Sequence, residues 1–332
     1  MSYETLGRSG LKVSRACLGT MTFGNKEWGT DEAESQRIVD AFVDAGQNFI
    51  DTADVYNAGA SEEIVGRAIK AKRDDVVLAT KGYNVMGAGP NERGSSRAHL
   101  TRALEASLRR LGTDYVDLYQ LHSWDHDTPI EESMATLDGF VRTGKVRYIG
   151  CSNFFASQLV EAQWAADRLH ATPLVSLQPQ YSLIWRDIEI DILPTAARHG
   201  MGVIVWSPLG GGMLTGKYAK GAELPADGRL SRGDDMEAEG MRALTLTDRN
   251  FEILTQVEAV AAELRATATA VSIAWLIGRP GVTSVIIGPR TVVQLNQNLA
   301  GFDLDLPVES AKSLSRVSRK PVSYPWYMQL RL

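Results

Sequence analysis

Eight short apolar runs, separated by longer stretches with helical spacing, most constrain the fold of this 332-residue chain. The runs cover residues 13–19, 48–51, 76–81, 115–122, 148–152, 174–178, 202–206 and 284–288. Short apolar runs bounded by turn residues are typical of buried strands. Strands that alternate with helices indicate a parallel sheet whose two faces are both covered. A doubly wound sheet can hold such strands, but a closed (β/α)8 TIM barrel fits their number and the chain length better.

The stretches between the runs have the spacing of amphipathic helices. The clearest apolar stripe consists of Leu100, Ala103, Leu104, Ser107, Leu108 and Leu111. A helix is expected over residues 31–45, where Gly46 ends it. Another is expected over residues 129–143. Thr128-Pro129-Ile130-Glu131 predicts a capping box at its start, with proline at the first helical position, and Gly144 ends it.

The ends and the long connections complete the expected architecture. Residues 3–14, YETLGRSGLKVS, predict a small hairpin before the first barrel strand, with Arg8-Ser9-Gly10 near its turn. Residues 81–95 and 208–247 are too long to be simple links. Both follow the carboxyl ends of strands, which is the face of a barrel that carries active sites. No interdomain linker or repeat interrupts the pattern, so residues 1–332 predict a single domain.

Composition gives no support to several classes of function. The net charge of −5 and the pI near 5.7 give no reason to expect a nucleic acid or an anionic membrane as a partner. Two cysteines, Cys17 and Cys151, are too few for a disulfide scaffold, and their spacing fits no zinc site. The chain has neither an apolar leader nor a long apolar run. A cytoplasmic protein is the expectation, and the oligomeric state stays open.

Polar side chains stand where several of these strands end. Alternate residues of a strand share a face, so each row of inward side chains begins apolar and ends in a polar or aromatic group. The residues expected to point into the barrel mouth are Asp51, Lys81, His122, Gln178 and Trp206.

Asp51 and Lys81 explain each other in such a mouth. A carboxylate or an ammonium is costly to bury alone, and pairing lessens that cost. Lys81 can then lie near the hydroxyl of Tyr56, where a cation favours the phenolate and lowers the pKa of the phenol. A phenol tuned in this way can donate a proton near neutral pH, while His122 orients the acceptor oxygen. The alternative is an Asp–Lys pair that is only structural, which the presence of Tyr56 and His122 at neighbouring strand ends disfavours.

These residues resemble the catalytic tetrad of the aldo-keto reductases. Asp51, Tyr56, Lys81 and His122 stand in FIDTADVY, LATK and DLYQLH, and the resemblance covers nearly the whole chain. The other motifs that carry it are LGTM (18–21), CSNF (151–154), LQPQYS (177–182), WSPLGGGMLTGKY (206–218) and IIGPRTVVQLNQN (286–298). The pattern is similar to the bacterial branch that resembles potassium-channel β subunits, in which tryptophan replaces the tyrosine that stacks on nicotinamide.

The resemblance implies a reductase of aldehydes or ketones that uses NADP(H) without a Rossmann domain, since no GxGxxG follows a strand. It implies that Ser152, Asn153 and Gln178 bind the nicotinamide carboxamide and that Trp206 stacks on the ring. The residues implied to hold the pyrophosphate and its covering loop are Ser207, Pro208, Leu209, Gly210, Gly212 and Lys217. Those implied for the adenosine 2′-phosphate and adenine are Gly288, Arg290, Gln294, Gln297 and Asn298. The remaining implied cofactor contacts are Gly19, Thr20, Met21 and Asp51.

The sequence departs from the family pattern at two cofactor positions. Many members have arginine where Gln294 stands and glutamate where Gln297 stands, although the channel-like branch also has glutamine at the former position. Arg290 still favours NADP over NAD, because a guanidinium matches a phosphate bidentately.

Two other motifs are set aside. Residues 211–218, GGMLTGKY, fit part of a P-loop, but Tyr218 stands where magnesium requires Ser or Thr. His122 and His126 are spaced for a metal only on a helix, and they follow a strand, so no metal is expected.

Three functions therefore stay open at this stage. The main one is an NADPH-dependent oxidoreductase acting on a small-molecule carbonyl or alcohol. The second is an NADP-binding sensor subunit with weak turnover that regulates a protein partner. The third is a reductase of nucleotide-linked keto-sugars. The aromatic tail, residues 322–328, either covers the side of the barrel or helps to shape its mouth.

Overall fold

The computed structural model describes residues 3–25, 27–226, 228–231, 233, 236–322 and 324–329. The chain divides into two compact units. The barrel unit comprises Met1–Pro179, Thr195–Trp206 and Gly281–Asn296. The second unit comprises Gln180–Pro194, Ser207–Pro280 and Gln297–Leu332. The expectation that residues 1–332 form a single domain stays a prediction.

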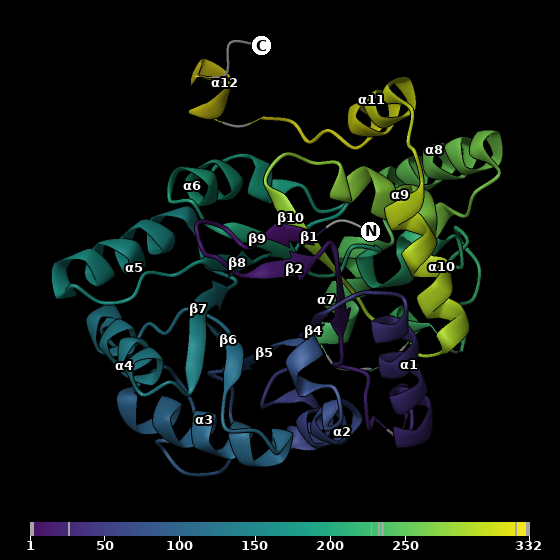
Figure 1. Cartoon of the computed structure of the whole chain (residues 1–332). Coiled ribbons are helices and arrows are strands. Elements are labelled where there is room, and N and C mark those ends of the chain that lie inside the picture. Colours follow the sequence, from purple (N-terminus) through teal and green to yellow (C-terminus); the bar gives the residue numbers. More distant parts are fainter. Residues whose placement is uncertain are drawn as a thin grey trace. The chain divides into compact units, whose positions relative to one another are not determined.

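Eight parallel strands close a barrel, in the order β10-β3-β4-β5-β6-β7-β8-β9 (Figure 1). They are β3 Ala16–Gly19, β4 Phe49–Asp51, β5 Val77–Gly82, β6 Val116–Leu121, β7 Val146–Ser152, β8 Ser176–Gln178, β9 Gly202–Val205 and β10 Val282–Ile287. Strand β10 pairs with both β9 and β3, so the sheet has no free edge. The (β/α)8 prediction is confirmed, and the doubly wound alternative is excluded.

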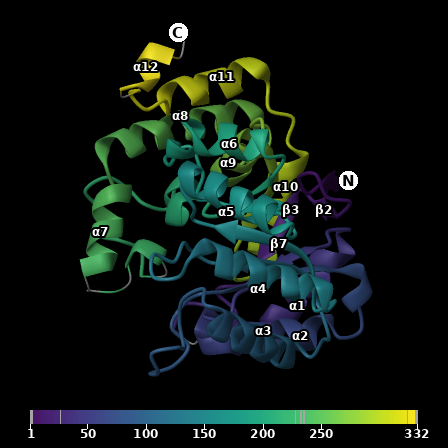
Figure 2. The same cartoon turned by 90° about the vertical axis from the view of Figure 1, so that its left-hand side faces the viewer.

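Helices cover the outside of this barrel after its first five strands (Figures 1 and 2). They are α1 Glu32–Asp44, α2 Ala60–Ile69, α3 Arg97–Leu111, α4 Ile130–Arg142 and α5 Ala156–Leu169, with the short 3₁₀ segments η1 Tyr56–Gly59 and η2 Arg73–Asp75. The predicted stripe of α3 is buried throughout. Helix α1 ends as predicted, because Gly46 adopts a φ of 73°, a conformation that glycine tolerates without strain.

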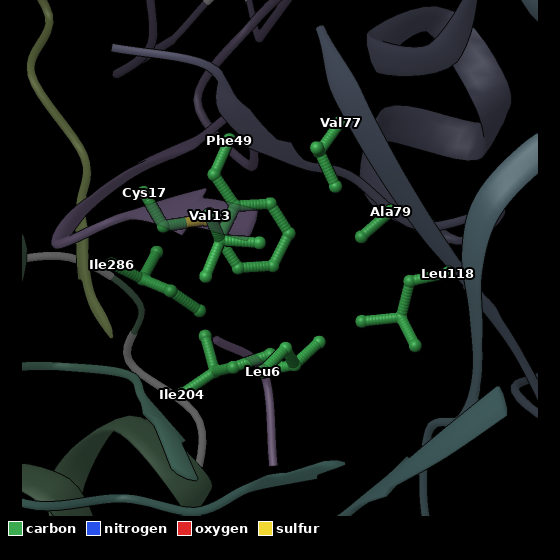
Figure 3. Close-up of a cluster of buried hydrophobic side chains, with 9 residues drawn as sticks. All are labelled: Leu6, Val13, Cys17, Phe49, Val77, Ala79, Leu118, Ile204 and Ile286. Atoms are coloured by element: carbon green, nitrogen blue, oxygen red, sulfur yellow. The ribbon is translucent and has the colours of Figure 1, made fainter. Parts of the chain in front are cut away.

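A two-stranded hairpin precedes the barrel and packs at the amino ends of its strands. It consists of β1 Tyr3–Thr5 and β2 Lys12–Ser14, and the Arg8 amide donates to the Gly200 carbonyl just before β9. Figure 3 shows Leu6 and Val13 of the hairpin gathered with apolar side chains of the barrel strands. The cluster consists of Leu6, Val13, Cys17, Phe49, Val77, Ala79, Leu118, Ile204 and Ile286. The barrel interior is therefore apolar at the amino ends of the strands, and the polar groups of the candidate site lie at the carboxyl ends.

Two sequence predictions need correction. The run 13–19 is not one strand, because Val13 and Ser14 belong to the hairpin and the barrel strand begins at Ala16. The capping box at Thr128 is also absent. Pro129 is the N-cap of α4, and the Thr128 hydroxyl donates to Asp125 Oδ2 at 2.7 Å instead of to the helix.

The second unit is mainly helical and includes most of the connection 208–247. Its elements are η3 Asp187–Glu189, η4 Gly210–Thr215, η5 Arg229–Ser231, α7 Met236–Thr245, α8 Asp248–Leu264, α9 Ala268–Ile277, α11 Val308–Val317 and α12 Trp326–Gln329. Two further helices, α6 Ile192–Arg198 and α10 Val292–Asp303, are divided between the two units. Parts of the connection, and Ser323 in the aromatic tail, lie outside the described residues.

Membrane-spanning length is not met by any single helix among the described residues. Helices α8 and α9 pass a test of length and apolar composition only as a pair, across a bend of 99°.

Candidate active site

The centre of the candidate site is an ion pair at the carboxyl ends of β4 and β5. Lys81 Nζ lies 2.6 Å from Asp51 Oδ2 and also donates to the Thr52 carbonyl at 2.9 Å. Burial favours the neutral lysine, but the charge of Asp51, and then Tyr56, outweigh that effect and raise the pKa of Lys81. Lys81 therefore stays an ammonium in a place that water does not reach.

Tyr56 lies on the turn that follows β4, with its hydroxyl 3.1 Å from Lys81 Nζ. An ammonium has no lone pair, so the phenol oxygen must be the acceptor of this hydrogen bond. The turn itself is unusual, since Asn57 and Ala58 have φ values of 51° and 54°. The Asn57 amide holds it in place by donating to the carbonyls of Met21 and Phe23. Residues kept in sparsely populated backbone regions are often found at functional sites.

Two glutamine side chains occupy the second oxygen of Asp51. Gln178 Nε2 donates to Asp51 Oδ1 at 2.9 Å, and Gln120 Nε2 lies at 3.2 Å from the same oxygen. Both glutamines are buried. Gln178 was expected to bind a cofactor, and its amide nitrogen also fixes the carboxylate. Gln120 was not singled out from the sequence, although it shares a strand face with His122 and stands only two residues before it.

His122 follows β6 directly, and its ring lies edge-on to that of Tyr56 with 5.9 Å between centroids. Burial, and then the positive charge of Lys81, lower the pKa of His122 to about 3. The imidazole is therefore neutral at physiological pH. Its Nδ1 lies 2.9 Å from the side-chain amide nitrogen of Asn84, which also lines a cavity of about 450 Å³ formed by the loops after β5 and β6.

Asn153 connects His122 to Trp206. Its amide nitrogen donates to the His122 carbonyl, and its oxygen accepts from the Trp206 indole at 3.1 Å. Asn153 has a φ of 59°, a second strained position at this end of the barrel. The hydroxyl of its neighbour Ser152 is buried and donates to the Gln178 carbonyl. Of the implied cofactor residues Ser152, Asn153 and Trp206, only Ser152 is buried.

The residues of the motif 18–21 have different surroundings from one another. A Cβ at Gly19 would stand 2.5 Å from Ile286 Cγ2, so this glycine permits close packing of β3 and β10. The Thr20 hydroxyl is buried within hydrogen-bonding distance of the Asp51 carbonyl and of Ser61. Met21 is half-buried, and its carbonyl accepts from Asn57.

Arg290 and Gln294 lie together beyond the end of β10. The Gln294 side chain accepts from the Arg290 amide at 2.8 Å, and the Arg290 guanidinium donates to the Trp28 carbonyl. Nothing stands near a Cβ placed at Gly288, so packing does not explain that glycine. Arg290 is half-buried, and Gly288, two residues before it, is exposed.

The implied pyrophosphate residues belong to the second unit. Ser207, Pro208 and Leu209 lead into η4, in which Gly210, Gly211 and Gly212 have φ values of 55°, 65° and 93°. A Cβ at Gly212 would meet Lys217 Cε at 2.6 Å, so the lysine stem lies directly against the glycine backbone. An ammonium beside such a backbone is a favourable setting for a phosphate.

The last two implied cofactor residues lie on α10 in the same unit. Gln297 is exposed, whereas Asn298 is 7% exposed.

Asp54 is a buried carboxyl close to the site, and its burial is not indicated by the sequence. Its carboxylate is fully buried, and among the described residues no hydrogen bond of good geometry reaches either oxygen. Burial, and then the charge of Glu62, raise the pKa of Asp54 to about 7, against smaller effects of the Val55 amide, Arg110 and Lys81. The backbone of Asp54 lies in a turn, in which the Tyr56 amide donates to the Ala53 carbonyl at 3.2 Å.

Two further side chains, Cys151 and Trp124, pack against the protein. The pKa of Cys151 is raised by burial, and the thiol is inert packing. Trp124 packs edge-on against Phe154 with 5.1 Å between centroids. Among the described residues no group of three or more His, Cys, Asp or Glu side chains is arranged to hold a metal ion.

Comparison with known proteins agrees with this architecture. The family model described as "Aldo/keto reductase family" matches residues 15–319. The chain is 39% identical over 342 residues to the uncharacterised oxidoreductase YrpG of Bacillus subtilis, covering 98% of this chain and 100% of that protein. It is 37% identical over 330 residues to a probable voltage-gated potassium channel subunit beta of Arabidopsis thaliana, covering 98% of each chain. It is 32% identical over 329 residues to the norsolorinic acid reductase of Aspergillus flavus, covering 96% of this chain and 81% of that protein.

The chain therefore belongs to the aldo/keto reductase family, as its motifs indicated. Its relatives include proteins described as oxidoreductases and others described as channel subunits.

Proposed function

We propose that this protein is an NADPH-dependent reductase that converts an aldehyde or ketone to an alcohol, with Tyr56 as the general acid. The observation that carries the proposal is the 3.1 Å contact between Lys81 Nζ and the Tyr56 hydroxyl. Because the phenol oxygen accepts from the ammonium, the phenol keeps its own proton, which it can donate to a substrate oxygen. The ammonium also stabilises the phenolate that remains after the proton has left.

The other members of the tetrad have supporting roles. Asp51 keeps Lys81 charged, and Gln120 and Gln178 keep the Asp51 carboxylate fixed in one orientation. His122 is neutral, so it donates a hydrogen bond to the carbonyl oxygen and is not the source of the proton. This difference in protonation leaves Tyr56 as the acid.

The cofactor part of the proposal is supported by residues in each unit. In the barrel unit, Trp206 presents a half-buried indole whose N–H is held by Asn153, and Arg290 lies next to the open backbone of Gly288. In the second unit, Lys217 lies against the glycines of η4. Taken unit by unit, the indole and the guanidinium of the barrel unit fit a nicotinamide ring and a phosphate, and the ammonium of the second unit fits a phosphate. Arg290 favours the 2′-phosphate of NADP. When bound, this cofactor supplies the hydride, while the protein supplies orientation and the proton.

The test is NADPH oxidation by the wild-type protein with 4-nitrobenzaldehyde and methylglyoxal as carbonyl substrates, with NADH as the comparison cofactor. The proposal predicts turnover with NADPH and a lower kcat/KM with NADH. NADPH binding, followed by tryptophan fluorescence, is measured on the same samples. Tight binding of NADPH without turnover of any carbonyl would contradict the proposed reductase activity.

A second candidate function is a cofactor-binding regulatory subunit with weak turnover. The Arabidopsis relative is described as a probable channel subunit. Large apolar side chains are also exposed at the N-cap of α5 and along the helix, namely Phe155 at 67%, Val160 at 43% and Trp164 at 63%. Val160 and Trp164 are one helical turn apart and so share a face, which is a feature of surfaces that bind other proteins. Binding without turnover in the test above would favour this candidate.

The third function, reduction of nucleotide-linked keto-sugars, stays a prediction. So do a cytoplasmic location and the lack of a nucleic-acid or membrane partner.

A further inference from the structure

Asn84 is a half-buried side chain that contacts His122 and that the roles above leave unassigned. It stands two residues beyond the end of β5, whereas His122 stands one residue beyond the end of the neighbouring strand β6. The Asn84 amide nitrogen lies 2.9 Å from His122 Nδ1. The other ring nitrogen, Nε2, is the one that the proposed function assigns to the substrate.

Backbone contacts fix both partners of this hydrogen bond. The His122 amide donates to the Gly82 carbonyl at 3.1 Å, and the Gly94 amide donates to the Tyr83 carbonyl at 2.7 Å. The far end of the same loop is tied to the loop after β6, because the Ser95 amide donates to Asp125 Oδ2 at 2.7 Å. Asn84 is therefore not a mobile surface amide, and its contact with the ring is set by the barrel.

A neutral imidazole exists in two tautomers, with its proton on Nδ1 or on Nε2. The titratable groups that face this ring are Lys81, whose cation disfavours a protonated imidazole, and Tyr56, whose hydroxyl accepts a hydrogen bond from Lys81. An amide NH₂ group is only a donor, so the nitrogen that it contacts must offer a lone pair. The proton of the ring is then on Nε2.

We propose that Asn84 is a positioning residue that holds His122 in the tautomer with its proton on Nε2, so that Nε2–H is the donor to the substrate carbonyl. The proposal rests on the proposed reductase function for its catalytic consequence. The tautomer itself is a property of the folded chain and can be measured without turnover.

The first test is nitrogen NMR of protein labelled with ¹⁵N-histidine. The chain has 5 histidines, and the His122→Gln variant identifies the resonances of His122. The expected result for the wild type is an unprotonated Nδ1 and a protonated Nε2, unchanged between about pH 5 and pH 8. A protonated Nδ1 in the wild type would overturn the proposal, because Asn84 would then be presenting its oxygen to the ring.

The second test compares Asn84→Ala and Asn84→Asp with the same changes at Asn91. Asn91 lies in the same loop and lines the same cavity, and it is exposed. A carboxylate at position 84 accepts from Nδ1–H and so moves the proton away from Nε2. We expect N84A to lower kcat by roughly 10-fold and N84D by at least about 100-fold, with NADPH affinity unchanged.

The pH profile separates this role from a merely structural one. Lowering the pH protonates the second nitrogen of the ring in N84D and restores Nε2–H, so the ratio of its rate to that of wild type should rise. The N91A and N91D variants should match the wild type in rate and in NMR spectrum. Unchanged ring resonances in N84A and N84D would overturn the proposal, and N84A alone decides it if N84D does not fold.

Failure of the proposed function gives a different result from failure of this inference. A wild type that reduces no carbonyl but has the expected tautomer would contradict the reductase assignment and keep the role of Asn84 toward the ring. A wild type that reduces carbonyls but has a protonated Nδ1 would keep the reductase assignment and contradict the role of Asn84.

Discussion

Lys81 Nζ lies 2.6 Å from Asp51 Oδ2, and the two side chains are 0% and 2% exposed. In a pair buried this completely, each charge offsets the desolvation cost of the other. Either charge alone in the same place would be strongly destabilising. The pair also fixes the ammonium next to the Tyr56 hydroxyl, so the same contact serves both the fold and the proposed chemistry.

Removing one member of the pair should cost more stability than removing both. Asp51→Asn is expected to lower the free energy of unfolding by about 3–5 kcal/mol, because it leaves a buried ammonium uncompensated. The double variant Asp51→Asn with Lys81→Met should recover most of that loss and stay inactive. Urea unfolding of the two variants checks this. A double variant less stable than D51N would show that the pair is not coupled in this way.

The buried carboxyl of Asp54 should make stability depend on pH. Its pKa is raised from 3.8 to about 7 in the folded protein by burial, and then by Glu62. The folded state therefore binds a proton more tightly than the unfolded state does, and the stability that this proton gives is lost as the pH rises toward 7. Between about pH 5 and pH 8 the loss is about 2–3 kcal/mol.

Asp54→Asn should remove this dependence, because an amide does not ionise. The measurement is the difference in unfolding free energy between pH 5 and pH 8, for the variant and for the wild type. The exposed residue Asp44, changed to Asn, is the matched control. Equal pH dependence of D54N and wild type would mean that Asp54 is ionised in the fold throughout this range.

Much of this architecture was predictable because it follows from alternation along strands. In β4, β5 and β6 the side chains that share a face run from the apolar floor to a polar end, for example from Phe49 to Asp51 and from Ala79 to Lys81. One glutamine on the same rows, Gln120, was passed over as a functional residue. The role of a buried amide depends on its hydrogen-bond partner, and the sequence does not show that Gln120 lies next to Asp51.

Sequence prediction was wrong or incomplete where long-range contacts decide the surroundings of a side chain. Thr128 has the sequence context of a helix cap, but Asp125 takes its hydroxyl together with the Ser95 amide of another loop. Asp54 lies in a turn, but its burial next to Glu62 of α2 is not indicated by its sequence context. Local propensity does not contain such tertiary partners.

The cofactor preference has its own test at Arg290. Arg290→Ala should weaken NADPH binding by about 10- to 100-fold and leave NADH binding nearly unchanged, because a charge-assisted contact to the 2′-phosphate is lost. Binding is followed by tryptophan fluorescence. Arg142→Ala removes a guanidinium that is 70% exposed on α4 and should change neither affinity. An equal loss of affinity for both cofactors would place Arg290 away from the 2′-phosphate.

The most direct measurement is the rate of NADPH oxidation with 4-nitrobenzaldehyde for wild type and Tyr56→Phe, with NADPH affinity determined in parallel. Tyr83→Phe, which removes a hydroxyl from the loop after β5, is the control. We predict that Tyr56→Phe lowers kcat by about 100-fold or more while NADPH affinity is unchanged, because only the proton donor is lost. A Tyr56→Phe variant that keeps the wild-type rate would contradict the account, since another group would then be supplying the proton.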